Sequence, residues 1–487
     1  MAAAAAAVEQ PASTPKGSYA DTMPTVPVEA SMSNNNISSS ASAGATALYE
    51  ALAAQSNNDS GPSSSSSSEE EESPWTSATH RAESLAWRRA FAPARLTVAD
   101  VAPGLRAYGI GQHGVTRAGE PILWCERFGH IQLPDGNGDA DAQTATTDAA
   151  TGTEDAAEGN ALGSMPFWKA ARLTYLAIVY ALEHSLAPGR RRVALVINCA
   201  GMTRRTVDER LTRILTDTTA VGYPACLGAV VLYNAPRWIA LAWRTLGRFV
   251  PRDWRQRLHV AAGAPAGLLR RLADPAQLPR RFGGRADDAL CGAEHYIASR
   301  HAAEVQQGCS KDAVAASSSS SSAGAAALEA GEEVPLEARE DAAARYSATL
   351  FWIGVCRDTA QTSGTSGTAP PPPAVERAAW LKKQGGIVPL WRKYFFVLQG
   401  HALLYKNAPG DAIPNNAVDL RRAAVHRGDA LPPARRSRLA GAPACVLVLD
   451  TPQRTFTLLC ASEAERNAWA QALQQHCCAG DDAPEVD

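Results

Sequence analysis

The sequence predicts a multidomain protein in which an α/β domain is followed by a small β-barrel or sandwich that a C-terminal helix closes. The chain has 487 residues, enough for about three domains of ordinary size. Low-complexity segments reduce that estimate to one medium-sized and one small domain. Between these segments the apolar pattern first mixes helical spacing with continuous runs, and then becomes a series of short strands.

Composition sets the expected domain boundaries. The N-terminal part is mainly Ala, Ser, Pro, Asn and Glu, so burial cannot offset the loss of chain entropy and we expect disorder. Ser317–Ser322 and Pro370–Pro373 indicate a linker between the two domains. The expected division is a disordered tail at 1–80, an α/β domain at 81–290 with a disordered insert at 134–163, a linker at 291–374, a β domain at 375–478 and an acidic tail at 479–487.

The net charge of −2 conceals a strong asymmetry. Residues 165–285 contain 20 Lys and Arg against 6 Asp and Glu, and residues 376–476 contain 14 against 7. Both expected domains are therefore basic and favour an anionic partner such as phospholipid headgroups. Nucleic acid is a weaker expectation, because the basic residues lack the interleaved aromatic side chains of a base-stacking surface.

The cysteines and apolar runs favour a cytoplasmic protein. The ten cysteines include no CxxC pair, and only Cys477 and Cys478 are close in sequence. The alanine-rich start lacks the basic and strongly apolar regions of a secretory leader. No apolar run approaches the roughly 18–20 residues that span a bilayer. We expect a reduced, cytoplasmic setting and peripheral membrane association.

The first domain carries the pattern of a parallel sheet. Val193–Ile197 and Ala229–Tyr233 are short continuous apolar runs, typical of strands buried on both faces. Helical spacing predicts helices at Met165–Leu186 and Val207–Val221. The second helix supplies the crossover that joins two parallel strands.

A basic amphipathic helix follows Pro236. An ordinary surface helix and a membrane-facing or lid helix both fit its pattern. Its apolar side carries Ile239, Ala242, Trp243, Leu246 and Val250, and its opposite side carries Arg237, Arg244 and Arg248.

Several motifs in order resemble the CRAL-TRIO lipid-binding family over about residues 84–285. They are Gly222-Tyr223-Pro224, Asn234-Ala235-Pro236, Asp274-Pro275, Leu278-Pro279 and Phe282-Gly283-Gly284. The resemblance implies a domain that holds one lipid in an apolar cavity, closed by a gate helix at 236–250. Ala225 replaces a glutamate of yeast-type phosphatidylinositol transfer proteins, whereas Arg257 keeps a basic group as the cavity headgroup candidate.

The second domain resembles a pleckstrin homology (PH) domain. The matching segments are Trp380–Gly386, Trp391–Leu398 and the helix that contains Trp469. The resemblance implies phosphoinositide binding by Lys383, Arg392 and Tyr405, although Tyr394 stands where a further arginine is expected. A PH fold that binds protein, or senses anionic membranes only weakly, is the open alternative.

Sequence motifs indicate no catalytic residue, metal site or cofactor. Gly109-x-Gly111-x-x-Gly114 matches a dinucleotide-binding pattern, but no helix is predicted after it, so we expect a loop. Asp135, Asn137 and Asp139 imitate a calcium loop whose twelfth position is Thr146 instead of glutamate.

The leading hypothesis is a non-enzymatic, peripheral lipid-binding or lipid-transfer protein that carries one phospholipid or other hydrophobic ligand. The alternative is a membrane-associated signalling adaptor or small-GTPase regulatory scaffold without transfer activity, with a signalling protein as partner. A similar pairing of these modules occurs in a regulator of small GTPases.

Overall fold

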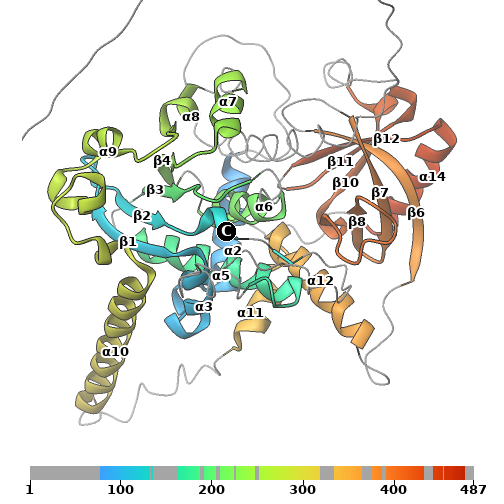
Figure 1. Cartoon of the computed structure of the whole chain (residues 1–487). Coiled ribbons are helices and arrows are strands. Elements are labelled where there is room, and N and C mark those ends of the chain that lie inside the picture. The colour runs from blue at the N-terminus through green and yellow to red at the C-terminus, as the bar shows by residue number, and fades with distance from the viewer. Residues whose placement is uncertain are drawn as a thin grey trace, which may run out of the picture.

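The computed structural model describes residues 77–131, 133–134, 162–186, 191–203, 209–223, 226–246, 252–318, 334–364, 374–385, 391–432, 443–452 and 454–477. Almost all of the expected tail at 1–80, the insert at 134–163 and the tail at 479–487 lie outside these residues. The described chain forms an α/β domain and a β domain that lie side by side (Figure 1).

A five-stranded sheet in the order β1-β2-β3-β4-β5 forms the centre of the first domain. β2 to β5 run parallel, whereas β1 pairs antiparallel with β2. Both buried strands predicted from the sequence are confirmed, and every residue of β4 is buried. The strands are β1 (Ile110–Val115), β2 (Pro121–Cys125), β3 (Val193–Asn198), β4 (Leu227–Tyr233) and β5 (Leu258–Val260).

Helices cover both faces of this sheet. On one face the side chains of β2, β3 and β4 join a core with α3 (Val98–Tyr108), α5 (Phe167–Ser185) and α6 (Glu209–Asp217). α6 continues into a π-helical turn, Thr218–Gly222. On the opposite face α9 (Ala266–Leu272) and the turns after it pack against the sheet, where Phe282 stacks on Trp124 with ring centroids 5.4 Å apart.

The prediction of a loop at Gly109–Gly114 is wrong, because Gly109 ends helix α3 and the residues after it form strand β1. A Cβ atom on Gly111 would lie 2.0 Å from the carbonyl oxygen of Cys291. The glycine therefore allows two backbone segments to approach closely.

The segment expected to be a linker differs from that expectation, because it contains helices α10 (Ala293–Ser318), α11 (Leu336–Ala343) and α12 (Ala348–Gly364). α12 packs against α5, and its Trp352 is fully buried, edge-on to Phe167. Composition concealed this helix, since its apolar residues lie between Ser-rich and Pro-rich stretches.

The second domain is a seven-stranded antiparallel sheet in the order β10-β11-β12-β6-β7-β8-β9. Helix α14 (Glu463–Gln474) closes it and buries Trp469 completely. The sequence did not predict β9 and β10. The strands are β6 (Val375–Gln384), β7 (Trp391–Gln399), β8 (Ala402–Lys406), β9 (Asn416–Asp419), β10 (Ala424–Arg427), β11 (Val446–Asp450) and β12 (Thr455–Leu459).

Helix α12 joins the two domains. Side chains of β7, β8 and β9 belong to the same apolar core as Trp352, whose indole nitrogen donates to the carbonyl oxygen of Pro414 at 3.0 Å. Arg422 pairs with Glu83 of α2 (Ser77–Phe91), with Nη1 and Oε2 2.7 Å apart.

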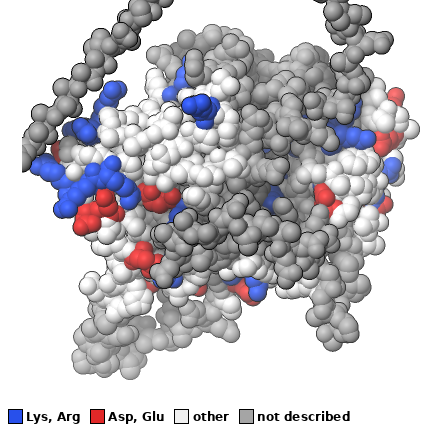
Figure 2. All heavy atoms as spheres, viewed as in Figure 1, with Lys and Arg blue, Asp and Glu red and all other residues white. Residues whose placement is uncertain are grey.

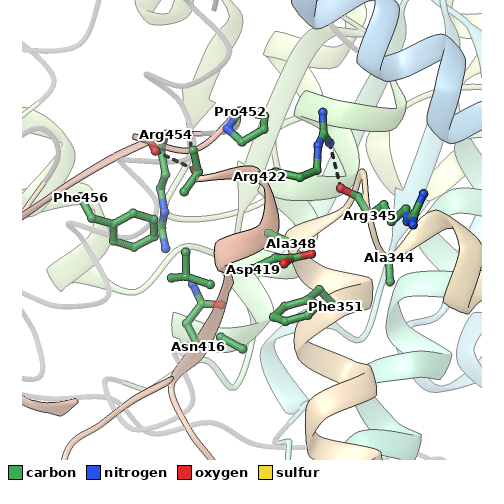
Figure 3. Close-up of a pocket in the computed structure, with 13 residues that line it drawn as sticks. Ala344, Arg345, Ala348, Phe351, Asn416, Asp419, Arg422, Pro452, Arg454 and Phe456 are labelled. Carbon is green, nitrogen blue, oxygen red and sulfur yellow. Dashed lines mark hydrogen bonds between the residues drawn. The ribbon is translucent and has the colours of Figure 1, made fainter. Parts of the chain in front are cut away.

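A pocket at this junction has a volume of about 30 Å³. Figure 3 shows Arg454 beside the ring of Phe456, and Arg422 bonded to the carbonyl of Arg345. The pocket has room for about two water molecules.

Asp217, at the end of α6, caps the N-terminus of α12. Its Oδ2 accepts hydrogen bonds from the Ser347 hydroxyl and from the backbone N–H of Thr349, both at 2.8 Å. Burial raises the pKa of this carboxyl group, and the hydrogen bonds oppose that shift. The cap satisfies a helix N–H that would otherwise lack a partner.

Replacing Asp217 should therefore weaken the join between the domains. We expect Asp217→Ala to lower the free energy of unfolding by about 1–2 kcal/mol, as the loss of an N-cap does. Asp217→Asn should cost less, because its amide oxygen can still accept. Urea denaturation followed by fluorescence measures both, with the exposed cap Asp274→Ala as control. Equal unfolding midpoints for D217A and D274A would contradict the assigned role.

Candidate lipid-binding and membrane-binding sites

An apolar cavity of about 60 Å³ lies between the sheet and helices α5 and α6. The strands contribute side chains that point to one face, and the helices contribute the apolar side of their surface. Its wall includes Ile110, Leu123, Leu195, Ile178, Leu211 and Leu215.

Two hydroxyl groups occur in residues of the cavity wall, and both have partners. The Tyr108 hydroxyl is 2.8 Å from Thr174 Oγ1, and Thr219 donates to the carbonyl of Leu215 at 3.0 Å. A buried polar group without a partner would favour a polar ligand. Because these two are satisfied, the cavity suits hydrocarbon.

The predicted gate corresponds to α7 (Arg237–Leu246). Ile239 is buried, and Trp243 is half-buried against the apolar core that forms the cavity wall. The Leu246 side chain and Val250 lie outside the described residues. The sequence prediction overlooked Leu241, which is 63% exposed one turn after the exposed Arg237.

The cavity headgroup candidate, Arg257, ends the short helix α8 (Arg252–Arg257). Its half-buried guanidinium donates to the carbonyl of Leu227 at 3.4 Å. Leu227 also belongs to the cavity wall. The arginine therefore contacts the backbone of a residue that bounds the cavity, but does not itself line the cavity.

The three predicted phosphoinositide-binding residues come together at one end of the β domain. Lys383 of β6 and Arg392 of β7 are direct cross-strand partners. The ammonium of Lys383 lies 5.5 Å from the ring centre of Tyr405 and 5.9 Å from that of Tyr394. Lys383 and Tyr405 are both buried, whereas Arg392 is half-buried.

A second basic surface covers α9 and the turns after it, where Figure 2 shows Lys and Arg side chains gathered. We call it the arginine patch. Arg281 pairs with Glu126 at 2.5 Å and Arg285 lies 3.9 Å from Asp274. The patch consists of six exposed arginines, Arg117, Arg270, Arg271, Arg280, Arg281 and Arg285.

Three arginines of the patch, Arg270, Arg271 and Arg280, form no salt bridge with any residue that the structure describes. Their charges face solvent and can attract an anionic surface. The motifs did not single them out, although the charge balance of residues 165–285 predicted a basic domain.

The described residues give little support to a reactive thiol, a metal site or a membrane-spanning helix. Burial raises the pKa of the Cys226 and Cys356 thiols to about 12, so both stay protonated at neutral pH. Within the described ranges no cluster of three or more His, Cys, Asp or Glu could hold a metal ion. No described helix is long and apolar enough to cross a bilayer.

Curated relatives match a limited part of the chain. A PH domain-containing protein of Dictyostelium discoideum is 23% identical over 101 residues, which are 21% of this chain and 20% of that protein. A RAC family serine/threonine-protein kinase homolog of the same organism is 29% identical over 100 residues, 20% of each chain. The chain thus spans about a fifth of the length of these two relatives.

Solved structures and family models complete the comparison. The carboxyl-terminal PH domain of pleckstrin is 21% identical, with 21% of this chain and 97% of that chain covered and a TM-score of 0.18. Family models match a CRAL/TRIO domain at residues 106–284 and a PH domain at residues 375–477. Both are binding domains that support lipid binding and membrane docking. The chain therefore contains a CRAL/TRIO domain followed by a PH domain, as the sequence motifs predicted.

Proposed function

We propose that this protein carries one phospholipid or other hydrophobic ligand in the CRAL/TRIO cavity and exchanges it at anionic membranes. The cavity carries this proposal. Its wall is apolar and its two hydroxyl groups are satisfied. Trp243 of the predicted gate packs against the same apolar core, although none of the described residues of α7 lines the cavity. Transfer between two apolar environments breaks no bond and needs no catalytic residue.

Loading requires the cavity to enlarge. A volume of about 60 Å³ is less than half of the roughly 150 Å³ of an engineered cavity that binds one benzene molecule, so an acyl chain does not fit. Leu211 and Leu215 of α6 form part of the wall, and α6 ends in a π-helical turn, an irregularity frequent at functional sites. Displacement of α6 and α7 from the sheet would admit an acyl chain.

Two surfaces support docking of the CRAL/TRIO domain on a membrane. The arginine patch would attract anionic headgroups, with about 1 kcal/mol from each basic residue near the surface. Leu241 on α7 is exposed beside Arg237, a combination that suits insertion at the headgroup boundary. Membrane contact at Leu241 would therefore act on the gate helix itself.

Filling the cavity should slow lipid transfer strongly. Leu195→Trp replaces an aliphatic side chain of the wall by a larger indole ring. The overpacking should lower the free energy of unfolding by about 1–3 kcal/mol. We expect at least tenfold slower transfer of a fluorescent phospholipid between vesicles, with vesicle binding unchanged. Ile297→Phe is the control, since Ile297 is buried on α10 away from the cavity. Transfer by L195W at the rate of I297F would refute the cavity as the lipid site.

Neutralising the arginine patch should weaken docking. Replacing Arg270, Arg271 and Arg280 by Gln should reduce binding to phosphatidylserine vesicles about fivefold per residue at low salt, with a smaller effect at high salt. Vesicle sedimentation measures this.

The control for the patch replaces three exposed arginines elsewhere, Arg89, Arg95 and Arg427. Equal losses in both triple variants would show that net charge alone, and no particular face, governs docking. Vesicle binding without any transfer by the unmodified protein would favour the adaptor or scaffold function instead.

A further inference from the structure

Helix α6 of the CRAL/TRIO domain reaches the headgroup-binding end of the PH domain. Its Arg213 donates from Nη1 to the carbonyl oxygen of Asn415 at 2.8 Å, in the turn between β8 and β9. The guanidinium carbon of Arg213 also lies 5.6 Å from the ring centre of Tyr405. Tyr405 is one of the three residues expected to bind a phosphoinositide.

Three basic side chains from two domains therefore lie at this end of the barrel. Lys383 lies 5.5 Å from the same Tyr405 ring, and Arg392 stands opposite Lys383 on the neighbouring strand. Side chains directly opposite one another on paired strands have Cβ atoms about 5 Å apart. Arg213 approaches Tyr405 from another domain, so the cationic cluster is assembled by the domain junction.

A cluster of basic side chains favours a ligand that carries several negative charges. The positive charges repel one another, and the attraction of each one to an anionic ligand offsets this repulsion. Phosphate groups are bound well by guanidinium groups, which donate two parallel hydrogen bonds, together with a lysine ammonium. Arginine stays protonated in proteins, so Arg213 carries a positive charge at neutral pH, and one of its N–H groups donates to the carbonyl of Asn415.

We propose that Arg213 is a third basic ligand of the phosphorylated inositol headgroup, in a composite site completed only when the two domains are docked. This rests on the proposed membrane function and deepens it. Arg213 lies between Leu211 and Leu215, whose side chains form part of the cavity wall. Headgroup capture would therefore act on the helix that must move for lipid to enter.

The test compares full-length variants in binding to phosphatidylcholine vesicles that contain phosphatidylinositol bisphosphate. Arg213→Gln should bind about fivefold more weakly, the loss of one basic contact near the membrane. Arg213→Lys keeps the charge and should lose less. Arg95→Gln, an exposed arginine on the turn Pro93–Arg95, is the matched control and should bind normally.

A second arm separates headgroup recognition from general attraction to the membrane. Soluble inositol trisphosphate, titrated calorimetrically, should also bind R213Q about fivefold more weakly than R95Q. Phosphatidylserine vesicles of equal charge should not discriminate between these two variants. Equal unfolding temperatures would show that R213Q retains its fold.

The outcomes distinguish the inference from the function on which it rests. If Lys383→Gln with Arg392→Gln leaves binding to the phosphoinositide vesicles intact, phosphoinositide docking through the PH domain is wrong. If that double variant loses binding while R213Q equals R95Q, only the composite site is wrong. Tighter binding by R213Q would also overturn it, because Arg213 would then obstruct the site.

Discussion

The docking of α12 between the two domains is the constraint on which the arrangement of the molecule depends. Asp217 caps the helix from the CRAL/TRIO side, and Trp352 contacts the core of one domain and a turn of the other. These contacts place the turn between β8 and β9 of the PH domain, and Tyr405, beside α6. Without these contacts the two binding domains would be independent of one another, and nothing would hold Arg213 near Tyr405.

Helix α6 occupies a central position as a result. One part of its surface lines the apolar cavity, another contacts the PH domain, and its final residue caps α12. A displacement of α6 therefore has consequences in both domains. Such an arrangement offers a physical route from membrane recognition to cavity opening, since a ligand that favours one position of α6 shifts the population of the open cavity.

Much of the fold follows from local patterns, and the rest depends on tertiary contacts. The buried runs at β3 and β4 and the capped helix around Trp469 carried clear signals. Helix α12 carried no such signal, because Ser-rich and Pro-rich stretches flank it and dominated the composition of the whole segment. A family pattern predicted Lys383, Arg392 and Tyr405 as phosphoinositide ligands, and that role stays a prediction. Arg213 lies 170 residues before Lys383 and comes near Tyr405 only through folding.

Native mass spectrometry of the full chain tests the central claim most directly. After incubation with mixed-lipid vesicles and removal of the membrane, the account predicts one lipid adduct per chain, with the mass of a single lipid class. A population that stays free of lipid under these conditions, in protein that still binds the vesicles, would contradict a lipid-carrying cavity.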